Sequence, residues 1–457
     1  MREPQIYPTL RSSGLLWLGD MPEHWGVQRA KWLFRKMNRP PRAEDDVVTC
    51  FRDGVVTLRK NRRTSGFTES MEHVGYQGVR RGDLVIHTMD AFAGAVGVSD
   101  ADGKSTGVYI VCRPRGGANP HYFSYVLREM ARSQWLLALA TGVRERSSDF
   151  RFETFGSQPL PFPPPDEQAA IVRFLDYWDS RIRRYIGAKR ELIRLLKEYK
   201  RGVAYSAATR GVRDGVPLKP TGAIWLDDVP RHWEMVRNRS MLKLRKRPVG
   251  DRSPDYTLLS LTVRGVVPRD LTNAQGKFPT DFDTYQIVEP GDLVFCLFDM
   301  DETPRTVGLS GQLGMITGAY AVFSCSDPEL GAFLNLFYQA MDDQKRLRPL
   351  YTGLRKVIQR GRFLGIATPV PPREERREIL AYVASENARL DAAIGRVQQQ
   401  MRLAFELRDR LVADAVTGRI EVRRLAAAAT DATAALEEIP SRGTEIDETD
   451  DSLEISA

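Results

Sequence analysis

The sequence predicts an α/β (α+β) protein in which two tandem globules are separated by two long helices. Two observations lead to this prediction. Most of the chain is written twice, and each copy ends in a stretch whose apolar residues follow a heptad pattern. We expect the two helices to form an antiparallel coiled-coil spacer with pseudo-two-fold symmetry. With 457 residues, 42% of them hydrophobic, the chain is long enough for more than one buried core.

The repeat keeps its register over most of the chain. Residues 17–25 (WLGDMPEHW) return as residues 225–233 (WLDDVPRHW), a shift of 208. Later matches are GVV at 54–56 and 265–267, GDLV at 82–85 and 291–294, VG at 96–97 and 307–308, TGVY at 106–109 against TGAY at 317–320, and TG at 141–142 and 352–353, at shifts up to 211. A chance similarity would not hold its register over such a length, so the chain is a tandem duplication.

This duplication divides the chain into seven segments. They are an N-terminal segment (1–25), a first globule (26–160), a first helix (161–211), a linker that repeats the N-terminal segment (212–233), a second globule (234–370), a second helix (371–420) and an acidic tail (421–457). The tail is predicted to be disordered, because it contains few large apolar residues.

Each globule mixes short apolar runs with glycine-punctuated turns. The predicted strands are 83–86 and 108–111 in the first copy, and 292–295 and 320–323 in the second. A helix follows the strands in each copy, at about 122–139 and about 332–346. Each globule is therefore predicted to be an α/β domain of ordinary size.

The first long helix follows a proline-rich run at 161–165, which cannot continue a helix. Asp166 and Glu167 suit its start, because they place negative charge at the positive end of the helix dipole. Apolar residues then recur at alternating steps of four and three, which is typical of a two-helix seam, and the phase returns 208 residues later. The seam is predicted at Ile171, Leu175, Trp178, Ile182, Leu192 and Leu196 in the first helix and at Ile379, Val383, Leu390, Val397, Leu407 and Leu411 in the second. The first helix would be roughly 60 Å long.

The distribution of charge indicates a polyanionic ligand. The net charge is +8, but residues 431–457 hold nine acidic residues and one basic residue, which leaves +16 on the rest. A body with that charge favours nucleic acid as a partner, and a solvated basic surface is the alternative.

Several other classes of protein and site are disfavoured. No stretch reaches the ~18 apolar residues that a membrane span needs, and the N-terminus has no apolar signal core, so we expect a cytoplasmic protein without a membrane partner. The four cysteines lie far apart without a C-x-x-C pair, and no metal site or disulfide is predicted.

No catalytic constellation is visible along the chain. His24 and His232 occupy matching places in the repeat, and we interpret each Pro-x-His-Trp turn as packing of the Trp and capping by the His. Residues 119–122 (NPHY) are similar to the NPPY loop of adenine methyltransferases but lack its middle proline. We interpret them as a turn that caps the following helix.

Three motifs occur in the same order in the first copy. They are a W-L-G-x-x-P-x-H-W entry at 17–25, a P-x-P-P-x-x-E-Q-x-x-I-x-x-F-L-D opening at 161–176, and an A-A-T-R-G end at 207–211. This arrangement resembles the specificity subunit of type I restriction–modification systems, over residues 12 to about 420. The second copy departs from the pattern: EER at 374–376 replaces the D-E-Q start, and VTG at 416–418 replaces the A-T-R-G end.

The resemblance implies a role in reading double-stranded DNA. Each globule would be a target-recognition domain for one half of a split, asymmetric sequence. The paired helices would set the gap and dock two adenine-methylating subunits, which a restriction and translocase subunit would join. The chain itself would be non-catalytic and hold no cofactor, with S-adenosylmethionine, ATP and Mg²⁺ expected on the partner subunits.

Charge and turn position select the candidate DNA contacts. In the first globule they are the basic cluster Arg59, Lys60, Asn61, Arg62 and Arg63, followed by Arg80 and Lys104, and in the second globule they are Arg264, Arg269, Lys277 and Arg305. Arg and Lys can neutralise phosphates, while Asn61 or an Arg can read base edges. For each residue, a solvated surface charge is the alternative.

Two other function classes stay open beside DNA recognition. An enzyme with its own methyltransferase or nuclease would need a cofactor domain, but only about 40 tail residues remain after two globules and two helices. A protein–protein scaffold with two interaction domains is the other alternative. It predicts no salt-dependent DNA affinity, whereas phosphate neutralisation makes DNA affinity fall steeply with salt.

Overall fold

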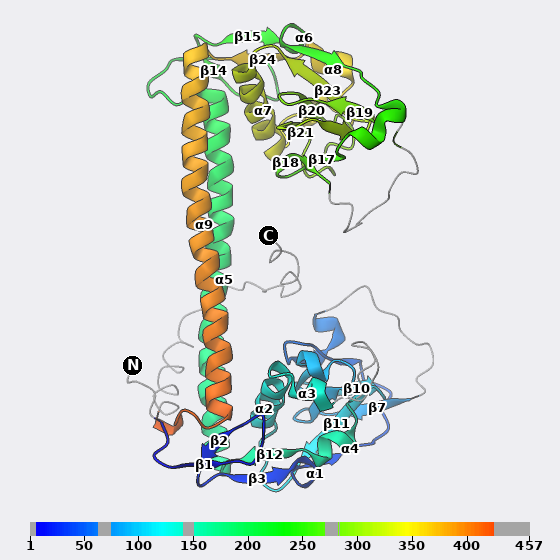
Figure 1. Cartoon of the computed structure of the whole chain (residues 1–457), viewed down its shortest axis with the longest axis vertical. Coiled ribbons are helices and arrows are strands. Elements are labelled where there is room, and N and C mark those ends of the chain that lie inside the picture. The colour runs from blue at the N-terminus through cyan, green and yellow to red at the C-terminus, as the bar shows by residue number, and fades with distance from the viewer. Residues whose placement is uncertain (1–5, 63–74, 140–149, 270–281, 283, 425–457) are drawn as a thin grey trace. The chain divides into compact units, whose positions relative to one another are not determined.

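The computed structural model describes residues 6–62, 75–139, 150–269, 282 and 284–424 (Figure 1). The chain forms two compact units. Unit 1 comprises residues 1–188 and 399–457, and unit 2 comprises residues 189–398. Each unit thus combines one globule with parts of both long helices.

A four-stranded antiparallel sheet lies at the centre of the unit 1 globule, in the order β4-β11-β8-β9. Its strands are β4 (Phe34–Lys36), β8 (Leu84–His87), β9 (Val96–Val98) and β11 (Tyr109–Pro114). Two-stranded pairs accompany it: β1 (Leu10–Ser12) with β2 (Asp20–Pro22), β3 (Gly26–Arg29) with β12 (Pro159–Phe162), β5 (Val48–Cys50) with β6 (Val56–Leu58), and β7 (Tyr76–Val79) with β10 (Gly103–Thr106). The two predicted strands of this copy are confirmed, and they pair with each other, with Val111 opposite Val85.

Helices complete the unit 1 globule. They are α1 (Ala30–Leu33), η1 (Arg59–Asn61), η2 (Ala91–Ala93), α2 (Pro120–Arg132), α3 (Trp135–Leu139) and α4 (Phe152–Ser157). The cap interpretation is confirmed, because the Asn119 side chain accepts a hydrogen bond from the His121 backbone N–H at 3.0 Å. The single helix predicted at 122–139 is wrong. Gln134 adopts a φ of 60°, which an α-helix cannot contain, so α2 and α3 are separate.

The unit 2 globule repeats the same sheet in the order β16-β23-β20-β21. Its strands are β16 (Leu242–Arg245), β20 (Leu293–Phe295), β21 (Val307–Leu309) and β23 (Ala321–Cys325). The accompanying pairs are β13 (Leu218–Lys219) with β14 (Val229–Pro230), β15 (Glu234–Arg237) with β24 (Ala367–Val370), β17 (Leu259–Thr262) with β18 (Gly265–Pro268), and β19 (Gln286–Val288) with β22 (Gly314–Ile316). The two predicted strands of this copy are confirmed, and they pair with each other, with Val294 opposite Val322.

The helices of the unit 2 globule also follow the first copy. They are α6 (Asn238–Met241), η4 (Gly250–Asp255), α7 (Pro328–Asp343), η5 (Arg348–Leu350) and α8 (Arg360–Gly365). The helix predicted at 332–346 begins earlier, at Pro328. The Asp327 side chain caps it by accepting hydrogen bonds from the backbone N–H groups of Glu329 and Leu330, at 2.9 and 3.2 Å.

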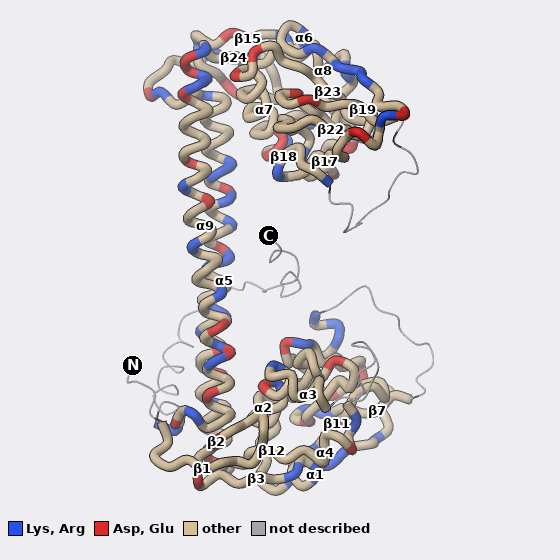
Figure 2. Tube along the Cα trace, viewed as in Figure 1, with Lys and Arg blue, Asp and Glu red and all other residues tan. Residues whose placement is uncertain are grey.

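The two long helices are α5 (Pro165–Arg210) and α9 (Arg373–Val416). Within each unit their segments pair in antiparallel fashion. In unit 1, Arg408 Nε lies 2.7 Å from an Asp179 carboxylate oxygen, and in unit 2, Lys200 Nζ lies 2.6 Å from one of Asp391. Lys and Arg are interspersed with Asp and Glu along both helices (Figure 2), as on a solvated helix face.

The buried stripe of α9 keeps the predicted heptad positions as far as Val397, and that of α5 keeps them as far as Ile182. Of the predicted seam residues, Ile171, Leu175, Ile182, Ile379, Val383, Leu390 and Val397 are buried, and Trp178, Leu196 and Leu411 are half-buried. The seam prediction is wrong for Leu192 and Leu407, which are 38% and 46% exposed. After Ile182 the next buried residue is Ile186, a step of four where the heptad required three. Ile186 therefore lies outside the strict heptad.

The N-terminal segment and the end of α9 share one core in unit 1. Trp25 and Met21 belong to the same buried cluster as Val416 and Val422. The assignment of residues 421–424 to a disordered tail is therefore wrong, since Val422 is fully buried. Residues 425–457 lie outside the described part of the chain.

The described residues show three further general features. None of their helices is long and apolar enough to cross a membrane. They bring together no group of three His, Cys, Asp or Glu side chains that could hold a metal ion. Their four cysteines are free thiols.

Candidate nucleic-acid interface

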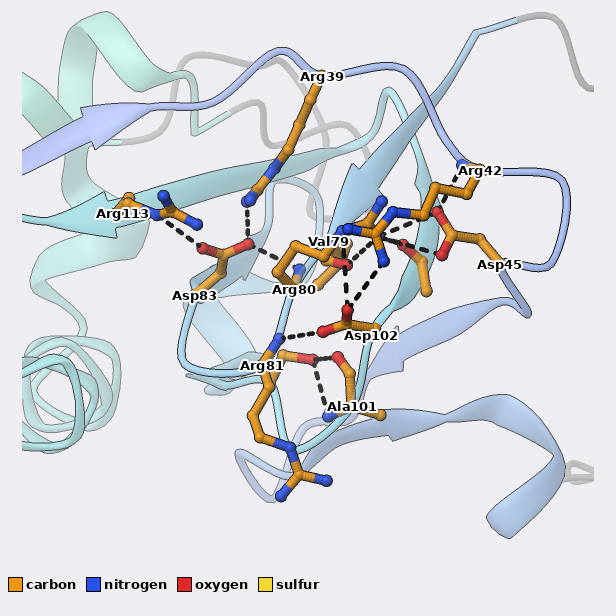
Figure 3. A network of polar contacts seen from close by, with 12 residues as sticks. Arg39, Arg42, Asp45, Val79, Arg80, Arg81, Asp83, Ala101, Asp102 and Arg113 are labelled. Carbon is orange, nitrogen blue, oxygen red and sulfur yellow. Dashed lines mark hydrogen bonds and ion pairs between the residues drawn. The ribbon is translucent and has the colours of Figure 1, made fainter.

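The repeated Gly-Asp turn places a buried carboxylate before the central strand of each sheet. Asp83 accepts a hydrogen bond from the Arg80 backbone N–H at 2.8 Å and binds the Arg39 guanidinium (Figure 3). In unit 2, Asp292 accepts from the Glu289 backbone N–H at 2.9 Å and lies 3.2 Å from Arg245 Nε. Burial raises the pKa of both carboxyls. The repeated motif thus fixes the turn into β8 or β20 and holds an arginine beside it.

A pocket opens at the matching strand ends of each globule, and we call it the strand-end pocket. In unit 1 its volume is about 910 Å³, and it lies between the end of β4, the start of β7 and the start of β11. In unit 2 its volume is about 310 Å³, and it lies between β16, β19 and the turn before β23. Both pockets are open to solvent on one side.

The frame of the strand-end pocket is the same in both units. Tyr76 and Tyr109 line it in unit 1, and Tyr285 and Tyr320 occupy the equivalent places in unit 2. Gln77 Nε2 donates to the Tyr109 carbonyl oxygen at 2.6 Å and to that of Thr106 at 3.3 Å. Gln286 Nε2 makes the same two bonds, to the carbonyl oxygens of Tyr320 at 2.7 Å and Thr317 at 3.3 Å.

Burial raises the pKa of the pocket phenols, which are protonated near neutral pH. It raises the pKa of Tyr109 to about 12, and it also raises the pKa of Tyr320. Tyr109 packs edge-on against His87, with ring centroids 4.6 Å apart, and Tyr320 stacks on Phe298. Each pocket therefore offers an aromatic wall whose phenol can donate a hydrogen bond.

The rims of the two pockets carry different side chains on this shared frame. Residues 36–38 (KMN) line the first pocket, and their repeat equivalents 244–246 (LRK) line the second. Arg151 adds a second cation to the first rim, and Arg247 and Arg360 add two to the second. Lys36, Arg151, Lys246, Arg247 and Arg360 are exposed. Each rim is thus basic, but the two rims present different hydrogen-bonding groups.

The predicted basic cluster of the first globule is partly neutralised. Lys60 Nζ lies 2.6 Å from an Asp46 carboxylate oxygen, and Arg62 Nη1 lies 2.6 Å from one of Asp53. Asn61 Nδ2 donates to Thr57 Oγ1 at 2.9 Å, and Arg59 Nε to Thr49 Oγ1 at 3.4 Å. Arg63 and the predicted contact Lys277 lie outside the described residues.

Arg80 and Arg305 bind internal carboxylates, contrary to their prediction as DNA contacts. The Arg80 side chain is only 11% exposed, and its Nη1 lies 3.0 Å from Asp45 (Figure 3). The Arg305 side chain is 14% exposed and lies 2.8 Å from Asp343. A guanidinium held in this way serves the fold, so both residues are corrected to structural roles.

The remaining predicted contacts lie nearer the surface. Lys104 is half-buried, and its Nζ sits 5.8 Å from the ring centroid of Tyr76, which lines the strand-end pocket. Arg264 is exposed in the turn between β17 and β18, and Arg269 follows β18.

Sequence reasoning missed the pocket itself. The signal that identifies it is a Tyr-Gln pair at 76–77 that returns at 285–286. That pair lies outside the longer repeated motifs, and the rim residues differ between copies, so a search for matching letters passes over them.

His24 and His232 each bind a glutamate at the start of a long helix. His24 Nε2 lies 2.8 Å from Glu167 Oε2, and Trp25 Nε1 donates to Glu167 Oε1 at 3.0 Å. In unit 2 the corresponding distances from Glu375 to His232 and Trp233 are 2.7 and 3.1 Å. The predicted packing of the Trp is confirmed, and the His binds a side-chain carboxylate where capping was expected.

Comparisons with known proteins bear on the fold. No protein-family model matches the chain, and no curated protein matches it. The fold is similar to a structure described as the "structural basis underlying complex assembly and conformational transition of the type I R-M system", with a TM-score of 0.59 and 14% identity, over 88% of this chain and 99% of that one.

Two further solved structures are similar. One is the HsdS subunit from Thermoanaerobacter tengcongensis, with a TM-score of 0.48 and 16% identity, over 88% of this chain and 98% of that one. The other is the type I restriction–modification S subunit from M. genitalium, with a TM-score of 0.33 and 12% identity, over 86% and 96%. The chain has the fold of the specificity subunit of type I restriction–modification systems, as its motifs predicted.

Proposed function

We propose that this chain is the DNA-reading subunit of a type I restriction–modification complex and is not itself catalytic. Each globule reads one part of a split, asymmetric sequence through its strand-end pocket and the basic residues around it. The observation that carries this proposal is that one pocket frame is built twice with two different rims.

The rims supply the chemistry that sequence reading needs. Exposed Lys and Arg side chains position a duplex by binding phosphates, and Asn and Arg form paired hydrogen bonds with the edges of adenine and guanine. The first rim offers Asn38 and Lys36, and the second offers Arg360 and Lys246. Because these groups differ, the two globules select different bases, and the target is not a palindrome.

The long helices are proposed to dock two adenine-methylating subunits, one on each copy of the repeat. Leu195 and Tyr199 on α5 are large apolar residues exposed to solvent, and so are their repeat equivalents Leu403 and Leu407 on α9. Matching apolar pairs at matching positions are what two identical partners require. S-adenosylmethionine, ATP and Mg²⁺ would then be bound by the methylating and restriction subunits.

The test is to co-express the chain with its methylating subunit and map methylated adenines across the host DNA. We expect methylation at one split sequence that depends on this chain. The K36A/N38A variant should alter base preference in one half of that sequence, and K246A/R360A in the other half. The exposed neighbours Arg35 and Lys243, which do not line the pockets, supply the controls R35A and K243A.

Two outcomes would contradict the proposal. If an assembled, active complex methylates without any sequence that depends on this chain, the chain is a scaffold. If K36A/N38A changes both halves of the target together, the globules do not read separately. Salt dependence gives an independent check, because a DNA-reading subunit loses affinity steeply with salt and a protein scaffold does not bind the duplex.

A further inference from the structure

Unit 1 contains a cavity of about 290 Å³ that is separate from the strand-end pocket. It lies between α2, the turn at η2 and the last part of α9. Four arginines line it, Arg52, Arg128, Arg132 and Arg408, together with two acidic residues, Glu129 and Asp409. We call it the arginine cavity.

Three of the four arginines bind a carboxylate of the protein. Arg132 makes a two-bonded pair with Glu129, at 2.8 and 2.6 Å. Arg52 Nη2 lies 2.9 Å from Asp90, and Arg408 Nε lies 2.7 Å from Asp179. These arginines are oriented by their partners and keep further N–H groups for a ligand, because a guanidinium has five donors.

Arg128 differs from the other three. No hydrogen bond or ion pair with a described residue holds its guanidinium, and the side chain is half-buried. Burial lowers the pKa of Arg128, and the positive charge of Arg408 lowers it further. Asp53 and Asp179 favour its charge through space without binding it, so a bound anion would stabilise this half-buried cation further.

The backbone is shaped to admit Arg128. Gly54 has a φ of +88°, and a Cβ at that position would lie 2.7 Å from Arg128 Nε. In the second copy, Gly265 has open space around its Cβ position, and Gln339 is the equivalent of Arg128. The unpaired charge is therefore a feature of the first copy alone.

We propose that the arginine cavity binds a phosphate group, with Arg128 as its principal ligand. Phosphate fits because it carries up to two negative charges and can accept bonds from several guanidinium groups at once, while one carboxylate is satisfied by a single guanidinium. The exposed Asp409 carboxylate repels a bound anion. The positive charges and N–H donors of Arg52, Arg132 and Arg408 attract it more strongly. The phosphate comes either from a nucleic-acid backbone or from a free nucleotide.

The test measures binding of pyrophosphate and of ATP to the full chain by calorimetry and by the shift in Tm. We expect both probes to bind the wild type and to raise its Tm, and we expect R128Q to lose at least tenfold in affinity. Gln is the residue that the second copy has at this place, so R128Q should fold, and R128K provides a second variant. R410Q, at an 82% exposed arginine on α9, should bind as the wild type does.

Duplex DNA distinguishes the two sources. If the phosphate belongs to the DNA backbone, R128Q weakens duplex binding and pyrophosphate competes with the duplex. The slope of log affinity against log salt concentration then falls by about one, as expected for the loss of one phosphate contact. If it belongs to a free nucleotide, R128Q loses ATP binding and binds the duplex normally. Failure of both probes with unchanged duplex binding overturns the phosphate site and leaves the DNA-reading function intact. If R128Q loses only the binding of a partner subunit, the ligand of the cavity is a carboxylate of that subunit, and the phosphate proposal is overturned as well.

Discussion

At the scale of single residues, the buried glutamate at the start of each long helix joins two distant motifs. Glu167 and Glu375 are each 1% exposed, and each accepts hydrogen bonds from the His and the Trp of its own Pro-x-His-Trp turn. Each glutamate also lies in the first turn of its helix, where the positive end of the helix dipole stabilises it. One carboxylate thus links the entry segment of each copy to its helix.

Replacing this carboxylate should weaken the unit that contains it. We expect Glu375→Gln to lower the free energy of unfolding by about 1–3 kcal/mol, because the amide has a single acceptor oxygen for the bonds from His232 and from the buried Trp233. Urea denaturation measures the change. Glu374→Gln, at the exposed neighbouring position, should stay within about 0.5 kcal/mol of the wild type. Equal effects of the two substitutions would show that the link contributes nothing to stability.

The same scale shows where reasoning from sequence ends. The His-Trp motif was visible twice, but its partner glutamate lies 142 or 143 residues away in the chain, so no local pattern could pair them. The basic residues were visible too, but charge alone does not separate Arg80, which binds Asp45, from Lys36, which is exposed at a pocket rim. Burial separates them, and burial depends on the tertiary fold.

At the scale of elements, substitutions in α5 distinguish the strict heptad register from the register seen in the structure. We expect Ile186→Asp to destabilise the protein by roughly 3 kcal/mol, because Ile186 is buried and the new charge has no partner. Leu192→Asp should have an effect within about 0.5 kcal/mol, because Leu192 is exposed. Urea midpoints of the two variants settle the comparison. If the seam followed the strict heptad, Leu192→Asp would destabilise the protein more than Ile186→Asp.

The start of α9 is tied to the start of α7 by a pH-sensitive cluster. Glu329 binds Arg373 and Arg377, and these bonds lower the pKa of its carboxyl. A lowered folded pKa means that this stabilisation is present above the unfolded value of about 4.3 and is lost as the pH falls through the folded value. Glu329→Gln should therefore lose less stability than the wild type between about pH 6 and about pH 3. Equal losses in urea midpoint would contradict the assignment.

At the scale of the whole molecule, the repeat predicted two copies of one fold, and the sheets at β8 and β20 confirm it. It could not predict how the copies combine into units. An apolar stripe shows that a helix has a partner, but not which stretch of chain supplies it. Asp179 in the first copy meets Arg408 in the second, and Tyr122 donates a hydrogen bond to the Val416 carbonyl oxygen at 3.4 Å.

Because unit 1 contains segments from both copies of the repeat, we expect the order of the copies along the chain to be exchangeable. In unit 1 the segment that follows α9 approaches the N-terminal segment, with Arg423 6.0 Å from the Tyr7 ring centroid. We expect a chain that runs from 212 to 424, continues through a short linker into residue 6 and ends at 211 to fold and to read the same DNA target. Circular dichroism and adenine mapping measure this. A folded permutant that reads a different target would show that the original chain order matters for recognition.

The sharing of helix ends also bears on ancestry. A single copy of the repeat contains Trp25 and the start of its helix but lacks the segment that completes its core, so it would have to borrow that segment from another identical chain. Two such chains lending each other their helix ends form a two-fold symmetric, domain-swapped dimer. On the proposed function, identical chains with identical rims would be restricted to palindromic targets. Fusion of two copies into one polypeptide would remove that restriction, since each half could then change its bases without the other.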